Sequence, residues 1–205
     1  MTPPEILRPG VLLIHIRHGQ TDWNAEERLQ GETDVPLNDH GRSQARRNGD
    51  RLADCLARFG RCVGDVDWVA SPLSRARETM EIVRGENGLE ADGYRLEERL
   101  REVAFGQWRG HTIPELKQID PDAVRARRRD KWGFLPPGGE SYGDLKRRVA
   151  GWLATLERDS VVVSHGGVYR VLHHLVVGTP TAEAPALPAP QDRIAVFRDG
   201  GVELI

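Results

Sequence analysis

Two apolar segments, far apart in the chain, each run directly into a histidine that is followed by glycine. The first reads IHIRHGQT and contains Arg17 and His18, and the second reads SVVVSHGGV and contains His165. Arginine is a permanent cation, and histidine is the side chain that titrates near neutral pH. A single histidine at the end of a strand is usually structural, but cations at the rim of a core are costly unless a ligand uses them. The conjunction of the two segments therefore points to a site that handles an anion.

The expected position of these residues supports the same conclusion. The carboxyl ends of parallel strands meet at one edge of an α/β sheet, and the helices that follow present free N–H groups there. We expect His18 and His165 to face one crevice with Arg17 beside them. The glycines after the histidines allow the backbone to approach a bound group closely.

The remaining sequence predicts strands that alternate with helices. One helical face carries Ala45, Leu52, Leu56 and Phe59. This alternation predicts an α/β fold with a mainly parallel sheet and helices on both faces, in a single domain over residues 1–205. The predicted strands are 11–17, 65–71 and 160–165; the helices are 41–59, 73–85, 141–157 and 168–178; a hairpin covers 192–205. The other segments are a strand leading into a loop at 94–103, a helical stretch broken by Pro121 at 113–132, a turn at 136–141 and a proline-rich surface loop at 178–191.

Composition excludes several classes of function. The chain has 205 residues, 39% hydrophobic and 29% charged, with a formal net charge of −2. These values are typical of a globular protein and give no electrostatic reason to expect nucleic acid or an anionic membrane as partner. No apolar run approaches the ~20 residues that span a bilayer. The N-terminal MTPPEILRPG does not read as a signal peptide, so we expect a cytoplasmic protein.

Several motifs in one order resemble the histidine phosphatase superfamily, which contains cofactor-dependent phosphoglycerate mutases and many phosphatases. RHGQT, the WN that follows and the later SHGG are the central ones. The resemblance covers Leu13 to about Leu175 and implies a three-layer, phosphoglycerate mutase-like architecture. Further matching segments are RLQG (28–31), PLNDHGRSQA (36–45), SPLSRARET (71–79), LREVAFGQWRG (100–110) and PPGGES (136–141).

The resemblance implies a catalytic set. His18 would be the nucleophile that forms a phosphohistidine, and Arg17 and Arg75 would clamp the phosphoryl oxygens. His165 would donate a hydrogen bond as charge spreads over those oxygens. Glu102 would protonate the leaving oxygen and then activate water.

Substrate contacts and one departure from the family follow from the same motifs. The motif FGQWRG selects Glu102 over Glu97 and Glu98, but Arg109 stands where the family usually has glutamate. This change puts in doubt one contact at the rim of the expected site, but it does not affect the catalytic set. The residues expected on the substrate side are Thr21, Asn24, Gln30, Gly31 and Gly166.

The resemblance leaves three functions open. The first is a metal-independent and cofactor-independent phosphomonoesterase acting on a small phosphorylated metabolite. The second is a mutase that returns the phosphoryl group to a sugar acid. The mutases carry a longer insertion after the glutamate, whereas 63 positions separate Glu102 from His165 here, which favours the phosphatase. The third, a non-catalytic phosphate- or protein-binding module, would be expected to lack a nucleophile, clamp or acid, and none is missing. A homodimer remains open as the assembly.

Substrate specificity has no readable code in the sequence. We expect it to reside in Gln30, in segment 105–135 and in the proline-rich loop. The run RARRRDK (125–131) could bind an anionic tail of the substrate, but a solvated helix face is the favoured interpretation.

Overall fold

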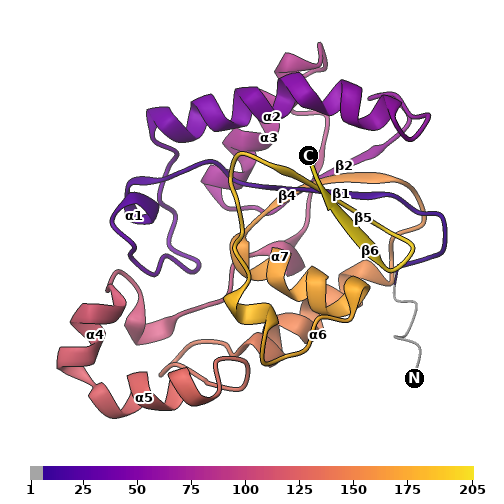
Figure 1. The fold of residues 1–205 in the computed structure, drawn as a ribbon. Coiled ribbons are helices and arrows are strands. Elements are labelled where there is room, and N and C mark those ends of the chain that lie inside the picture. Colours follow the sequence, from indigo (N-terminus) through magenta and orange to yellow (C-terminus); the bar gives the residue numbers. More distant parts are fainter. Residues whose placement is uncertain (1–6) are drawn as a thin grey trace.

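The computed structural model describes residues 7–205, which form an α/β structure around one six-stranded sheet (Figure 1). The strands lie in the order β3-β2-β4-β1-β5-β6. The expectation about a signal peptide rests on residues 1–10 and falls mostly outside the described range. The strands are β1 (Leu13–Arg17), β2 (Asp67–Ala70), β3 (Arg95–Leu96), β4 (Ser160–Ser164), β5 (Ile194–Arg198) and β6 (Gly201–Leu204).

The sheet is mainly parallel, as predicted. Strand β4 pairs in parallel with both β1 and β2, and β2 pairs in parallel with β3, whereas β5 runs antiparallel to β1 and to β6. The register sets Arg17 opposite Ser164. Strand β3 is much shorter than the predicted 94–103, because the chain turns at Glu97, whose side chain accepts from the N–H of Arg99.

Helices cover both faces of the sheet, which confirms the predicted layers (Figure 1). Along β1, Leu13 packs towards α6 and α7, and Ile14 and Ile16 pack towards α2 and α3. The α-helices are α1 (Asp22–Ala25), α2 (Asp39–Ala57), α3 (Ser74–Glu86), α4 (Ile113–Ile119), α5 (Pro121–Arg129), α6 (Tyr142–Leu153) and α7 (Gly166–Leu172). Shorter helical turns are η1 (Glu98–Leu100), η2 (Gly106–Trp108), η3 (His173–Val177) and η4 (Ala184–Ala186).

Local sequence signals explain most helix ends. Ser141 caps α6 in a reciprocal box with Asp144, and Pro121 starts α5 directly after α4. Helix α2 ends at Ala57, so Phe59 lies beyond it and is half-buried, unlike the fully buried Leu52 and Leu56.

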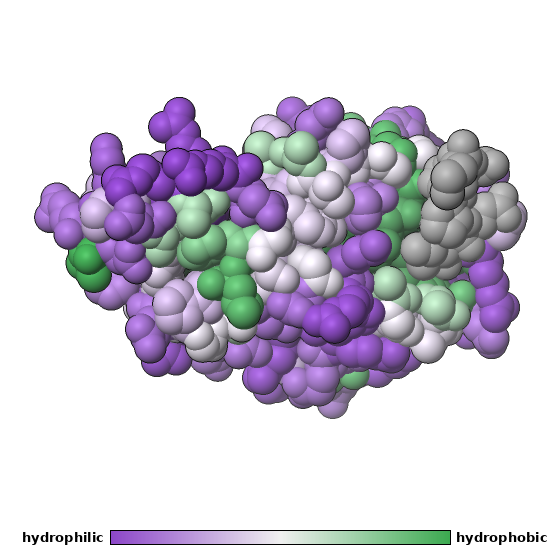
Figure 2. Space-filling view, turned by 90° about the horizontal axis from the view of Figure 1, so that it is seen from below, coloured by the Kyte–Doolittle hydropathy of each residue, from purple (hydrophilic) through white to green (hydrophobic). Residues whose placement is uncertain are grey.

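The surface carries no extended apolar face in the view from below. Figure 2 shows hydrophobic residues in small separate patches among hydrophilic ones. Among the helices of residues 7–205, none combines the length and the apolar character needed to cross a membrane.

Two glycines let the loop after β1 lie directly against the start of α2. A Cβ at Gly19 would overlap the backbone of Gly41, and a Cβ at Gly41 would overlap the backbone of Gln20. The N–H of Gln20 also donates to the Gln44 side chain at 2.8 Å. This contact fixes the loop that begins with His18, and it explains the glycine of the PLNDHGRSQA segment.

We expect Gly41→Ala to lower the free energy of unfolding by about 1–3 kcal/mol, because its methyl group has no space. The matched control is Gly151→Ala in α6, where a Cβ meets nothing within 4 Å and alanine should stabilise by roughly 0.5–1 kcal/mol. Urea unfolding of the two variants measures both changes. Equal stabilities would show that the loop adapts to the methyl group.

Candidate active site

The carboxyl ends of β1, β2 and β4 lie side by side at one edge of the sheet, and a pocket of about 120 Å³ lies next to the end of β1. His165, which follows β4, is fully buried and is not part of the pocket lining. The ring centroids of His18 and His165 lie 5.1 Å apart, as expected for residues that follow neighbouring parallel strands. The pocket lining includes Arg17, His18, Asn24, Gln30, Arg75 and Glu102.

His18 is held as a neutral ring with a defined tautomer. Its Nδ1–H donates to the Gly19 carbonyl at 2.7 Å, which leaves the lone pair on Nε2. Burial, reinforced by Arg75 and Arg17, lowers its pKa well below 6.5. The sequence suggested only a useful neutral fraction, whereas the structure holds the ring neutral throughout the physiological range.

Arg75 is fully buried and fixed on three sides. Its Nη1 and Nη2 donate to the carbonyls of Thr33 and Gly31, each at 2.7 Å, and its Nε donates to His18 Nε2 at 3.2 Å. Burial lowers its pKa to about 10, so the guanidinium stays charged at neutral pH. Arg75 therefore acts as a rigid cation beside the His18 ring.

Arg17 and His165 both carry buried polar atoms that no group within residues 7–205 satisfies. The Nη1 of Arg17 donates to the Ala189 carbonyl at 2.5 Å, and its Nε has no partner. The Ser71 hydroxyl lies 2.7 Å from Nε2 of His165; since this hydroxyl has no other acceptor, it donates there, and Nδ1 carries the ring proton. Buried donors without a partner are the kind of group that stabilises an oxyanion.

The Glu102 carboxylate accepts hydrogen bonds from the backbone, including that of Gly167, two residues after His165. Its Oε1 accepts from the N–H groups of Val103 at 2.9 Å and Gly167 at 3.0 Å. A Cβ at Gly167 would overlap Oε1, so the second glycine of SHGG is required for this contact. Sequence analysis assigned a role to Gly166 and missed Gly167. The second glycine of the SHGG motif was the feature of the sequence that could have indicated it.

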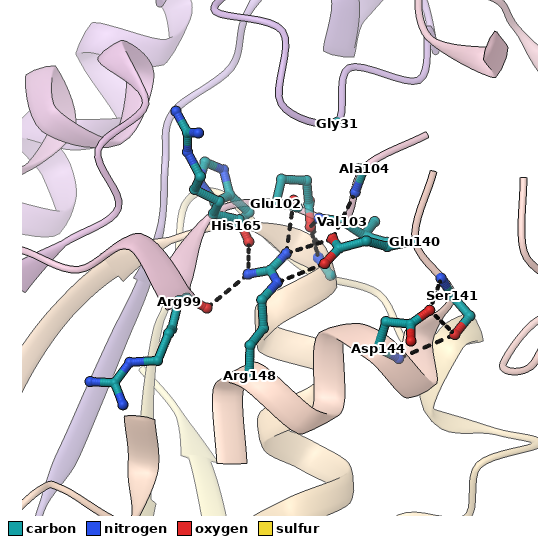
Figure 3. A network of polar contacts seen from close by, with 12 residues as sticks. Gly31, Arg99, Glu102, Val103, Ala104, Glu140, Ser141, Asp144, Arg148 and His165 are labelled. Atoms are coloured by element: carbon teal, nitrogen blue, oxygen red, sulfur yellow. Dashed lines mark hydrogen bonds and ion pairs between the residues drawn. The ribbon is translucent and has the colours of Figure 1, made fainter. Parts of the chain in front are cut away.

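An arginine on α6 holds the backbone around Glu102 in place. The Nη groups of Arg148 donate to the carbonyls of Arg99, Arg101 and Glu102 at 2.7–3.0 Å (Figure 3). Glu140 accepts from Arg148 and, through Oε2, from the Ala104 N–H at 3.1 Å. Sequence analysis missed both residues, although Glu140 lies within the PPGGES segment.

The loop after His18 is cross-braced by the proline-rich segment. Thr21 and Asn24 form a capping box, and the Asn24 Oδ1 also accepts from Gln191 Nε2 at 3.0 Å. The same Gln191 nitrogen donates to the His18 carbonyl at 3.0 Å. Thr21 is therefore a structural cap, Asn24 keeps its Nδ2 donor for a ligand, and Gln191 is a further residue that sequence analysis did not identify.

The other expected contacts fall at or beside the pocket. Gln30 lines it with a buried Oε1 that has no partner, and Gly31 passes closely against residues 103–105 with φ +56°. Gly166 packs against the Arg17 guanidinium. Arg109, the departure from the family pattern, is exposed and outside the pocket lining.

The competing glutamates take no part in the pocket. Glu97 pairs with Arg99, and Glu98 is exposed and pairs with Arg101. Within residues 7–205, no group of three or more His, Cys, Asp or Glu side chains is arranged to hold a metal ion.

Three buried histidines make the fold sensitive to acid. Burial lowers the pKa of His15 to about 3 and those of His18 and His165 well below 6.5, whereas the unfolded chain binds these protons near pH 6.5. Their contribution to stability is therefore present above pH 6.5 and lost below it. We expect the free energy of unfolding to fall by on the order of 1 kcal/mol per histidine and pH unit between pH 6.5 and 5.

Urea unfolding from pH 7.5 to 5 measures this slope. His165→Gln should make it shallower, and His40→Gln, at an exposed position, should not change it. An identical slope in the His165→Gln variant would contradict the prediction.

Comparisons with known proteins show to which family the chain belongs. Residues 13–200 match the model of the histidine phosphatase superfamily (branch 1). The chain is 38% identical to phosphoglycerate mutase-like protein 4 of Arabidopsis thaliana over 170 residues, covering 78% of this chain and 69% of the relative. It is 34% identical to glucosyl-3-phosphoglycerate phosphatase of Mycobacterium tuberculosis over 190 residues, covering 85% and 79%.

A solved structure extends the likeness to the fold. The mycobacterial glucosyl-3-phosphoglycerate phosphatase in complex with VO3 superposes with a TM-score of 0.74 at 30% identity, covering 96% of this chain and 98% of the other. The family match spans nearly all of the described chain. The chain belongs to the histidine phosphatase superfamily, branch 1.

Proposed function

We propose that this protein is a phosphomonoesterase that passes the phosphoryl group of a small phosphorylated metabolite to Nε2 of His18 and then to water. The observation that carries the proposal is the state of His18, a neutral ring with its Nδ1–H donated to Gly19, at a pocket that Arg17, whose Nε–H is unpaired among residues 7–205, also lines. The mycobacterial relative that bears a phosphatase name supports the choice of hydrolysis.

In the first step, the lone pair of His18 Nε2 forms a bond to phosphorus while the bond from phosphorus to the ester oxygen breaks. The bound phosphoryl group takes over the Arg75 Nε–H that otherwise donates to Nε2. The carboxyl group of Glu102 supplies a proton to the departing oxygen, which leaves as an alcohol.

In the second step, Glu102 takes a proton from water as the water oxygen attacks phosphorus. The bond between phosphorus and Nε2 breaks, which returns His18 to its neutral form and releases inorganic phosphate. The donors of Arg17, Arg75 and His165 stabilise the charge on the phosphoryl oxygens in both steps. We further propose that the reaction needs no metal ion and that the substrate is a small cytoplasmic metabolite rather than nucleic acid.

A mutase is the second candidate, because the Arabidopsis relative is named phosphoglycerate mutase-like. The two reactions share the first step and differ only in which hydroxyl receives the phosphoryl group. Phosphate release, compared with interconversion of 2- and 3-phosphoglycerate, separates them, and predominant interconversion would favour the mutase.

Rapid-quench trapping with a ³²P-labelled phosphomonoester tests the intermediate. We expect wild-type protein to retain acid-labile label, because the bond from phosphorus to the imidazole nitrogen hydrolyses in acid, and His18→Ala to retain none. The control is His40→Ala, which removes an exposed histidine from α2 and should keep the label. Label on the His18→Ala protein would overturn the assignment of the nucleophile.

The role of Glu102 is tested by the leaving group. Glu102→Gln should slow the release of a poor leaving group, such as an alkyl alcohol, far more than the release of p-nitrophenol, which needs no proton. Steady-state rates on an alkyl and an aryl phosphate measure the ratio, with the exposed Glu98→Gln as control. An equal loss on both substrates would remove Glu102 from the role of acid.

A further inference from the structure

One side-chain amide in the proline-rich segment supports the pocket from outside its lining. Segment 178–191 was predicted as a surface loop, and Gln191 at its end is half-buried. Its Nε2 donates to the carbonyl of His18 and to Oδ1 of Asn24, each at 3.0 Å. His18 and Asn24 line the pocket of about 120 Å³, whereas Gln191 does not. A single nitrogen atom therefore joins the proposed nucleophile to a polar side chain of the same pocket.

The hydrogen bonds of Gln191 assign the orientation of two amides. A primary amide nitrogen carries two hydrogens, and the two acceptors of Gln191 use both. The reversed Gln191 amide would set its oxygen against two acceptor oxygens. Oδ1 of Asn24 accepts from the Thr21 N–H at 3.2 Å and from Gln191 at 3.0 Å. The Asn24 amide is thereby held so that Nδ2, a donor, is the atom left for a ligand in the pocket.

Helix α2 holds the backbone of Gln191 in place. Nδ2 of Asn48, a fully buried side chain, donates to the Gln191 carbonyl at 2.9 Å, and Arg51 donates to the carbonyl of Asp192 at 3.2 Å. The chain then enters β5 at the fully buried Ile194. The backbone around Gln191 is therefore anchored by residues that lie outside the pocket lining.

The same contact completes the support of the His18 backbone. The His18 N–H donates to the Ser164 carbonyl of β4 at 3.0 Å, and the His18 carbonyl accepts from Gln191. A strand thus fixes one end of this residue, and Gln191 fixes the other. Because the nitrogen that holds the His18 carbonyl also holds Asn24, one atom sets the position of the Asn24 amide relative to His18.

We propose that Gln191 is a positioning residue, which holds the Asn24 amide with its Nδ2 donor towards the phosphoryl group. This inference rests on the proposed function, in which the pocket binds that group. Asn24 makes the contact, and Gln191 acts through it. Without Gln191, the Asn24 amide is free to turn its oxygen towards the phosphate, which replaces an attraction by a repulsion.

A double-mutant cycle on the binding of inorganic phosphate tests the proposal. Isothermal titration calorimetry gives the dissociation constants of wild type, Gln191→Met, Asn24→Ala and the double variant. Methionine keeps the length of glutamine but has no donor. We expect Asn24→Ala to weaken binding about tenfold or more, as for a hydrogen bond to a charged group, and Gln191→Met to weaken it several-fold. In the Asn24→Ala background, Gln191→Met should have little further effect.

The matched control is Gln118→Met, which makes the same change at an exposed position on α4 and should keep the wild-type dissociation constant. Gln191→Ala repeats the cycle with a side chain too short to disturb the packing. Unchanged phosphate binding in both Gln191 variants would overturn the proposal. An equal loss with and without the Asn24 side chain would also overturn it, because Gln191 would then support the loop without acting through Asn24.

The cycle is separate from the test of the reaction, because phosphate binding needs no turnover. Absence of both hydrolysis and trapped label would overturn the proposed phosphatase function, whereas coupling between Gln191 and Asn24 in phosphate binding would still support the positioning role. A wild-type protein that does not bind inorganic phosphate would overturn both proposals.

Discussion

The parallel pairing of β1 with β4 is the constraint on which the site depends. It sets Arg17 opposite Ser164, and the His18 N–H continues the ladder by donating to the Ser164 carbonyl at 3.0 Å. Each strand then releases its chain into a loop at the same level, which brings His18 and His165 to a centroid distance of 5.1 Å. A slip of one residue would send the next side chains to opposite faces and separate the rings. The valines of β4, fully buried between two helical layers, make such a slip expensive.

The electrostatics of the site follow from the burial of two arginine side chains that form no ion pair within residues 7–205. Arg17 and Arg75 remain charged at neutral pH, and their fields help to keep His18 and His165 neutral. The site thus combines a neutral imidazole ring with buried cations, a combination that suits the nucleophile and the anion of the proposed reaction. The energy needed to bury these charges comes from the apolar layers on either side of the sheet, so stability and chemistry are coupled through the same strands.

Local patterns in the sequence predicted the layers, the mainly parallel sheet and the neighbouring positions of Arg17, His18 and His165, whereas Arg75 and Glu102 were implied by the resemblance to the family. Buried strands consist of runs of residues such as valine and isoleucine, and the residues that follow parallel strands lie at the same edge of the sheet. Sequence analysis missed Gly167, Arg148 and Gln191, whose roles arise from contacts between segments 46 to 173 positions apart. Sequence analysis also favoured a solvated helix face for residues 125–131, because the periodicity of a helix does not show which of its charged side chains a neighbouring loop covers. Arg127 and Lys131 are in fact half-buried.

The proline-rich loop illustrates why composition conceals function. Proline lacks an N–H, so a segment rich in proline cannot pair all of its carbonyls within its own backbone. Such carbonyls attract cations, and here they orient Arg17, Arg170 and Lys131 without cancelling their charge. A loop of acidic residues in the same place would have neutralised these cations and competed with a phosphorylated substrate. Low complexity is therefore compatible with a demanding role, because the backbone rather than the side chains of this loop arranges the positive field around the site.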